Sequence, residues 1–315
     1  MRFAVVCLGL LVGDLFAAPA PMSRQVTVAL DGSGDFRSVQ TAVDSVPEGN
    51  PQSVTVFIRK GRYEELVRIP RNKPNLRLLG EDRHEVVLVA LNNDKLHPGV
   101  RARTVLGIEG DGCVVENLTV RNATPYKGSQ AEAVVINADR CVLRRADFLS
   151  FQDTLNLNGR VYVEDCYVEG DVDYVWGSGA AVFDRCHLRT MHDGYVVQAR
   201  NGAGRTGFVF LDCRLTAAPE AKRLYLARIE SEKFPDSQVA FVRCSMPSAV
   251  RPEGWLVKGE LLATLRFAEH AAVDEKGNAL DLSARRGGRV LSAEQAAELT
   301  VDKLLAGKDG WKPAR

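Results

Sequence analysis

Neither sign of charge is in excess in this chain of 315 residues, which has 41 Lys and Arg against 40 Asp and Glu. This balance gives no overall field for a polyanionic partner, so we expect binding to neither nucleic acid nor a membrane surface. Long apolar runs are also missing after the N-terminus, and we therefore expect no membrane span. With 45% hydrophobic residues and only 13 prolines, the composition indicates a folded chain that is large enough for one substantial core.

The first twenty residues differ from the rest of the chain. Arg2 precedes an apolar segment at 3–12, and small residues follow at 17–20, an order typical of a secretory signal. The alternative is an N-terminal strand or helix of the fold itself. We predict a signal peptide at 1–20 with an undetermined cleavage site, secretion to an extracellular or periplasmic space, and a single domain over 25–315.

Helical periodicity is scarce. One short helix is predicted within residues 36–46, with Asp35 as its N-cap and Pro47 as its end. A second is predicted over 292–307, where a Ser-x-x-Gln capping box starts the segment. Between them, short runs rich in β-branched residues alternate with Gly, Asp and Asn, which indicates strands bounded by turns.

A cysteine-containing unit recurs six times at intervals of 20 to 31 residues. Such periods indicate a repeat architecture. The spine of leucine-rich repeats is missing, and a doubly wound α/β fold would require a helix after each strand. We therefore predict an all-β chain folded as a right-handed parallel β-helix, with short capping helices at its two ends. The repeated cysteines are Cys113, Cys141, Cys166, Cys186, Cys213 and Cys244.

We expect these cysteines to stack in the interior, one per coil. Most of them are interpreted as small buried hydrophobic residues. Cys166 and Cys186 lie one coil apart and are the better candidates for a disulfide, since the expected separation of their Cα atoms suits one. No spacing typical of a zinc site is found among the six.

Polar residues in the middle of the chain recur at the same period. Asp153 and Asp173 are 20 residues apart, and each has apolar neighbours. A turn residue that only bonds to backbone would explain Asp153 taken alone, but not the whole set. Because adjacent strand residues face opposite ways, Gln152 and Asp153 both reach one site only if the chain bends there. The expected column comprises Gln130, Gln152, Asp153, Asp173, Gln198, Arg200 and Arg228.

Two carboxyl groups about one strand spacing apart resist simultaneous ionisation, so their titrations separate. One then stays protonated and serves as a general acid, while the other, paired with an arginine, stays ionised and attacks. Glutamine amides supply neutral donors for a developing oxyanion. The set predicts acyl transfer to water.

The ordered motifs resemble those of pectin methylesterases. Besides Gln130, the similarity lies in the segments FQDTL at 151–155, GDVDYVWG at 170–177, QAR at 198–200 and LAR at 226–228. It extends from DGSGDF at 31–36, through GRYEE at 61–65 and RPEGW at 251–255, to DGWKP at 309–313. The resemblance therefore covers nearly all of the chain after the signal segment.

The resemblance implies a role for each matching residue. Asp173 would attack the methyl-ester carbonyl, Asp153 would protonate the departing methanol, and Arg228 would keep Asp173 charged. Gln130 and Gln152 would hold the oxyanion. It also implies a parallel β-helix that acts on a polysaccharide, pectin or its oligogalacturonate esters, without metal or organic cofactor, and in which Cys166 and Cys186 are often bridged. We expect a monomer. The predicted substrate contacts are Trp176, Gln198, Arg200 and Thr104.

The sugar-binding positions depart from the family pattern. Ile229 and Glu230 stand where the family usually has Pro-Trp, and Asn156 replaces a tyrosine, while Trp176 offers another stacking surface. Glu230 would repel a galacturonate carboxylate. Three alternatives therefore stay open: a catalytically weak polysaccharide-binding protein, an esterase for a different or shorter ester, and a glycoside hydrolase, which also uses two carboxylates.

Overall fold

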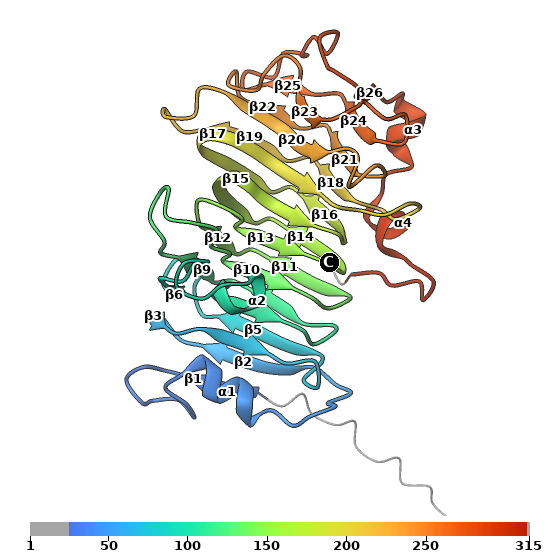
Figure 1. The fold of residues 1–315 in the computed structure, drawn as a ribbon. Coiled ribbons are helices and arrows are strands. Elements are labelled where there is room, and N and C mark those ends of the chain that lie inside the picture. Colours follow the sequence, from blue (N-terminus) through green and yellow to red (C-terminus); the bar gives the residue numbers. More distant parts are fainter. Residues whose placement is uncertain (1–24, 314–315) are drawn as a thin grey trace, which may run out of the picture.

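Short strands stack in parallel along the chain and wind it into a right-handed parallel β-helix, as predicted (Figure 1). The computed structural model describes residues 25–313, so the predicted signal peptide at 1–20 lies outside them. Alternate residues of each strand point into the core, as in β2 (Val54–Ile58), where Val54, Val56 and Ile58 are buried. Within the described residues, no helix is long and apolar enough to cross a membrane.

Most coils contribute strands to three faces. Among the described residues, the first face is an eleven-stranded sheet. Its strands are β1 (Gln25–Val28), β2, β5 (Leu76–Gly80), β8 (Val114–Glu116), β11 (Cys141–Arg144), β14 (Arg160–Glu164), β16 (Ala180–Asp184), β18 (Phe208–Leu211), β21 (Gln238–Val242), β24 (Arg266–His270) and β26 (Arg289–Val290).

The other two faces are joined by two long strands, β15 (Tyr167–Gly177) and β17 (His187–Ala199). The second face contains the first halves of β15 and β17 together with β3 (Gly61–Glu64), β6 (Val86–Ala90), β9 (Thr119–Asn122), β12 (Asp147–Leu149), β19 (Arg214–Ala217), β22 (Ser245–Met246) and β25 (Val273–Asp274). The third contains their second halves with β4 (Val67–Ile69), β7 (Leu106–Ile108), β10 (Val134–Ile136), β13 (Leu155–Leu157), β20 (Leu224–Glu230) and β23 (Trp255–Lys258).

A single left-handed residue turns the chain from the first face to the second in seven successive coils. The φ angles at this position are between 47° and 58°, although none of the residues is glycine. Such a conformation is disfavoured for L-residues and persists only where the surroundings require it. Here it makes the sharp corner of the coil. The residues are Asn117, Arg145, Asp165, Arg185, Asp212, Arg243 and Ala271.

The six cysteines are buried in two ladders rather than the single stack that was predicted. Cys113 and Cys141 pair at the start of the first face, because Val142 is in register with Val114. The other four lie at the corner between the first and second faces, where Tyr167 is in register with His187. Cys166 and Cys186 therefore occupy neighbouring coils as expected, but both are free thiols in the structure.

A short helix, α1 (Val39–Ser45), lies beside β1 and β2 at the N-terminal end of the β-helix (Figure 1). Its N-cap is Ser38, not the predicted Asp35. The Oγ of Ser38 accepts from the backbone N–H of Thr41, whereas Asp35 accepts from the backbone N–H of Thr27 and so ties down the preceding loop. The helix therefore begins three residues later than the sequence suggested.

The predicted C-terminal helix is two helices, α3 (Ala293–Ala297) and α4 (Val301–Leu305), because Thr300 starts a new N-cap. The predicted capping box of Ser292 and Gln295 is present. Helix α4 packs against β14 and β16, on the side of the β-helix rather than on its end. Apolar residues on the outer surface of the first face require this cover, among them Val142, Tyr162, Val182 and Val209.

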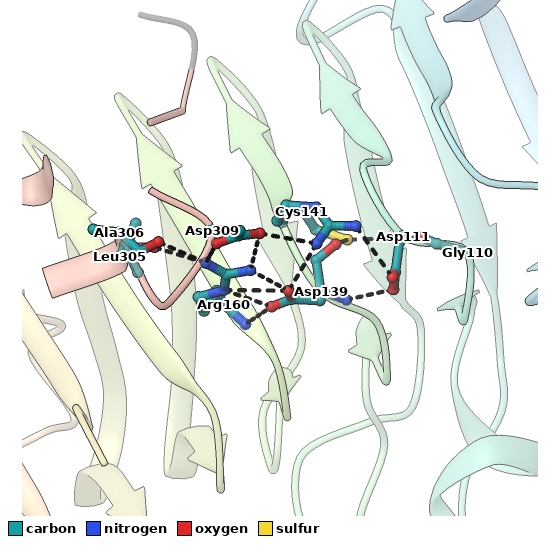
Figure 2. A network of polar contacts seen from close by, with 9 residues as sticks. Gly110, Asp111, Asp139, Cys141, Arg160, Leu305, Ala306 and Asp309 are labelled. Atoms are coloured by element: carbon teal, nitrogen blue, oxygen red, sulfur yellow. Dashed lines mark hydrogen bonds and ion pairs between the residues drawn. The ribbon is translucent and has the colours of Figure 1, made fainter. Parts of the chain in front are cut away.

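An ionic network fastens this C-terminal segment to the middle coils (Figure 2). Arg160 of β14 donates to the carbonyl of Ala306 at 3.0 Å and to the carboxylate of Asp309 at 2.9 Å. The same guanidinium bonds to Asp139 in the preceding coil at 2.9 Å. Arg140 also contacts Asp309, at 3.2 Å. Residues 305–309 are thereby bound to coils that precede them by more than 140 positions.

Candidate active site

Asp153 and Asp173 occupy neighbouring coils on the third side of the β-helix. Gln152 forms a parallel bridge with Val172, and the backbone N–H of Asp153 donates to the carbonyl of Val172 at 3.0 Å. Both aspartates are left-handed, with φ of 66° and 50°, and the register of β15 shifts around Val172. The chain therefore bends at Gln152 and Asp153, which satisfies the condition for both side chains to reach one site.

Asp173 is paired with an arginine. Its carboxylate accepts from Arg228 Nε at 3.2 Å and from Nη2 of the same guanidinium, which projects from β20. Burial raises the pKa of Asp173, but Arg228 opposes that rise, and Arg200 and Lys258 add to the opposition. The pair is largely enclosed, since the side chain of Asp173 is 6% exposed and that of Arg228 is 21% exposed.

Asp153 is in a different environment, because two acidic residues and two arginines act on its carboxyl. Burial is the main cause that raises its pKa well above the ordinary value, and Glu132 and then Asp173 add to the rise. Arg103 Nη2 donates to Asp153 Oδ2 at a long 3.4 Å, which offsets the rise only in part. The pKa of both carboxyls is raised, but that of Asp153 is raised well above its ordinary value, whereas a two-pronged arginine opposes the rise at Asp173.

Two charged residues beside Asp153 were not identified from the sequence. Arg103 ends the short helix α2 (Val100–Arg103), and Glu132 lies two residues before β10, in the coil next to Asp153. A signal was present for Glu132, because it is a charged residue between two alanines in an apolar run and precedes Asp153 by about one coil. No comparable signal exists for Arg103.

The two predicted oxyanion residues lie on adjacent coils. The backbone N–H of Ala131, the residue after Gln130, donates to the carbonyl of Gln152 at 3.2 Å. Both glutamines are half-buried, and Gln130 Oε1 accepts from the hydroxyl of Ser129 at 2.9 Å. Because the amide oxygen of Gln130 accepts this hydrogen bond, the amide N–H groups are the polar groups of the side chain that are left to donate.

Three of the predicted substrate contacts form a cluster in which Arg200 is central. Arg200 lies 4.5 Å from the ring centroid of Trp176 and 5.6 Å from that of Phe234, and its Nε donates to Gln198 at 2.8 Å. Arg200 thus covers a face of Trp176 that was expected to stack on sugar. Trp176, Arg200 and Phe234 line a cleft of about 470 Å³. Thr104 does not support a substrate contact, since it is fully buried and its hydroxyl donates to the backbone carbonyl of Leu106.

A second cleft, of about 400 Å³, begins at Val172 beside the nucleophile candidate. Tyr195 and Tyr225 stack there with ring centroids 6.0 Å apart, and Arg228 lies 5.0 Å from the centroid of Tyr195. Arg223 and Arg251 complete the lining with Asp193 and Gly194.

Glu230 was expected to repel a galacturonate. Its negative charge is balanced by Lys233 at 2.5 Å, and the residue faces Lys258 in the next coil.

In the part of the chain that the structure describes, no group of three or more His, Cys, Asp or Glu side chains is arranged to hold a metal ion. The polar groups gathered here are two carboxyls in different electrostatic surroundings, arginines and amides. Such a set is suited to nucleophilic attack on a carbonyl carbon with proton transfer to the leaving group.

Comparisons with known proteins agree with this chemistry. The family model described as pectinesterase matches residues 25–308. "Pectinesterase 31" of Arabidopsis thaliana is 34% identical over 246 residues, covering 74% of this chain and 77% of the relative. "Pectinesterase 1" of Olea europaea is 29% identical, with coverage of 91% and 80%.

Solved structures show the same fold. The pectin methylesterase from carrot superposes with a TM-score of 0.82 at 25% identity, covering 93% of this chain and 96% of that one. A pectin methylesterase in complex with a hexasaccharide gives 0.80 at 23% identity, covering 94% and 100%. The chain belongs to the pectinesterase family, whose members are carboxylic ester hydrolases.

Proposed function

We propose that this protein is a secreted esterase that removes methyl esters from the galacturonate units of pectin and releases methanol. One observation supports this most strongly: Asp153 and Asp173 lie on adjacent coils in different electrostatic surroundings, with Arg228 paired to Asp173 and Glu132 raising the pKa of Asp153. The relatives named as pectinesterases and the neighbour solved with a hexasaccharide support the choice of a pectic substrate. Secretion rests on the signal-like segment at 1–20.

In the proposed reaction, the Asp173 carboxylate attacks the ester carbonyl carbon, and Gln130 and Gln152 donate hydrogen bonds to the oxyanion. The bond from carbon to the methoxy oxygen then breaks, and Asp153 gives its proton to that oxygen, so that methanol leaves. Asp153, now a carboxylate, removes a proton from water, whose oxygen attacks the acyl-enzyme. This step frees the galacturonate carboxyl and restores both aspartates to their first states.

A second candidate is a protein that binds pectin but turns it over weakly, or that prefers a shorter ester. It is favoured by Ile229 and Glu230, which stand in place of the Pro-Trp of the family pattern. The ion pair of Glu230 with Lys233 weakens this argument, because it reduces repulsion of a substrate carboxylate.

Methanol and new reducing ends, measured from the same sample of highly esterified pectin, would separate the candidates. Methanol without reducing ends supports the esterase, and reducing ends without methanol would establish a glycoside hydrolase instead. Methyl esters of short oligogalacturonates, assayed beside the polymer, show which length is preferred. Asp173→Ala should bind pectin with the fold retained but release no methanol; turnover at the wild-type rate would exclude Asp173 as nucleophile.

A further inference from the structure

Glu132 is a fully buried carboxylate next to the proposed acid. The backbone N–H of Ala133 donates to the carbonyl of Thr154 at 2.9 Å, so Glu132 is in line with Asp153 one coil later. Adjacent coils of a parallel sheet are about 4.8 Å apart. Glu132 is 0% exposed, and a carboxylate buried to that degree so close to another is costly unless a cation and hydrogen bonds compensate it.

Arg103 provides this compensation and also reaches Asp153. Its Nε and Nη2 atoms bond to the two oxygens of Glu132, each at 2.7 Å, in the two-pronged geometry that is strongest for this pair. Its Nη1 donates to Asp94 at 2.6 Å. The contact with Asp153 is 3.4 Å, much longer than the other three. Arg103 therefore holds Asp153 in place while most of its hydrogen-bonding capacity is used by Glu132 and Asp94.

We propose that Arg103 and Glu132 form a positioning pair for the esterase reaction, in which Arg103 fixes the Asp153 carboxyl and Glu132 limits the positive charge that acts on it. The inference rests on the proposed function, because it is there that Asp153 acts as proton donor. An arginine facing Asp153 without Glu132 would ionise the acid before it could protonate methanol. Together the two residues meet both requirements of the acid, because the Asp153 carboxyl is fixed in position and retains its proton.

The other charges around Asp153 do not replace this pair. Asp173 raises the pKa of Asp153. Arg103 lowers this pKa, and Arg200 lowers it by a smaller amount. Arg200 is held by Gln198 and packed on Trp176, so its position is set by other contacts. Removing the charge of Glu132, which is fully buried, therefore changes the charge around Asp153 without removing a residue that faces the substrate.

Glu132→Gln tests the pair, because glutamine keeps the shape of the side chain but leaves the charge of Arg103 to Asp153. The alkaline limb of kcat/KM for methanol release reports the proton on Asp153 in the free enzyme. We expect this limb to move to lower pH by about 1 to 3 units, the usual effect of an adjacent opposite charge. KM measured at low pH should stay close to that of the wild type, since Glu132 does not reach the surface.

A double variant separates positioning from general damage. Arg103→Gln combined with Glu132→Gln removes both charges, so the alkaline limb should return toward its wild-type position, although the single Glu132→Gln change moves it. Glu269→Gln is the matched control, because Glu269 in β24 is also buried and bonds to Arg285 at 2.8 Å, away from the aspartates. Glu269→Gln should lower the free energy of unfolding and leave the alkaline limb of kcat/KM at its wild-type pH.

Two results would overturn the pair: an alkaline limb unmoved by Glu132→Gln, or an equal shift in Glu269→Gln. NMR titration of the Asp153 carboxyl carbon, assigned with Asp153→Asn, gives the same test without substrate. In Glu132→Gln that titration should move to lower pH. A wild-type protein that releases no methanol from any ester would refute the proposed function, whereas an unchanged carboxyl titration would refute the positioning pair alone.

Discussion

Replacing Arg228 by glutamine should change activity and stability in opposite directions with pH. In the wild type, burial raises the pKa of Asp173 and Arg228 opposes the rise. Without the guanidinium, the pKa of Asp173 rises further, by about 1 to 3 units, because the opposing charge is lost. The acidic limb of kcat/KM, which requires Asp173 as a carboxylate, should therefore move to higher pH by that amount.

Stability should follow the reverse trend. Below about pH 4 Asp173 is protonated in both the folded and the unfolded protein, and the missing arginine costs little. As the pH rises, the unfolded chain releases this proton while the folded variant keeps it, so the free energy of unfolding falls by about 1.4 kcal/mol per pH unit. The loss levels off once the pH exceeds the folded pKa. Relative to the wild type, a rise of about 1 to 3 units in the folded pKa corresponds to a total loss of about 1.4 to 4 kcal/mol.

The assays are methanol release from pectin and urea unfolding, both between pH 4 and pH 8. Arg243→Gln is the control, because Arg243 makes the same two-pronged bond to Asp212, at 2.7 Å for each contact, in a pair about half exposed to solvent. That variant should lose no more than about 1 kcal/mol of unfolding free energy, and the acidic limb of its kcat/KM should stay at the wild-type pH. An Arg228→Gln enzyme with an unmoved acidic limb would show that Arg228 does not keep Asp173 ionised.

Three further changes have separate expected outcomes. Asp153→Asn should lower kcat for methanol release by about 10²- to 10⁴-fold with an unchanged circular dichroism spectrum, since an amide does not supply the proton; activity near that of the wild type would exclude the acid role. Phe210→Ala should cost about 3 to 5 kcal/mol in urea unfolding, because Phe210 stacks between Phe183 at 4.6 Å and Phe241 at 4.5 Å in the core. Arg160→Ala should cost about 1.5 to 3 kcal/mol and expose the C-terminal segment to limited proteolysis, which a tail still resistant to protease would contradict.

The coil spacing predicted the fold and the alignment of the two aspartates because a parallel β-helix repeats its register. A spacing of 20 residues between Asp153 and Asp173 is one coil, and the structure places them on neighbouring coils. Where coils differ in length, the period alone did not give the register. Cys141 begins a strand of the first face, whereas Cys166 follows one at the corner, so two similar motifs belong to different ladders.

Side-chain partners across coils could not be predicted. Arg200 has the spacing of a substrate contact, yet Trp176 and Gln198 hold it in place. Thr104 was likewise predicted as a substrate contact, but its hydroxyl donates to a backbone carbonyl. Arg103 reaches Glu132 from a helix of four residues with no side-chain N-cap bond, and such a short helix leaves no periodic signal. These contacts depend on loop paths, which the period does not determine.

The return of residues 305–309 to Arg160 has a mechanical consequence. In an open solenoid, force applied at the last residue would peel off the terminal coil first. Here the force would pass through helix α4 into β14 and β16, the strands that precede and follow Asp173 in the chain. Strands β24 and β26 would lie outside the path of this force. Pulling on this protein from its C-terminus should therefore give one large rupture at the centre of the molecule instead of a series of small steps from its edge.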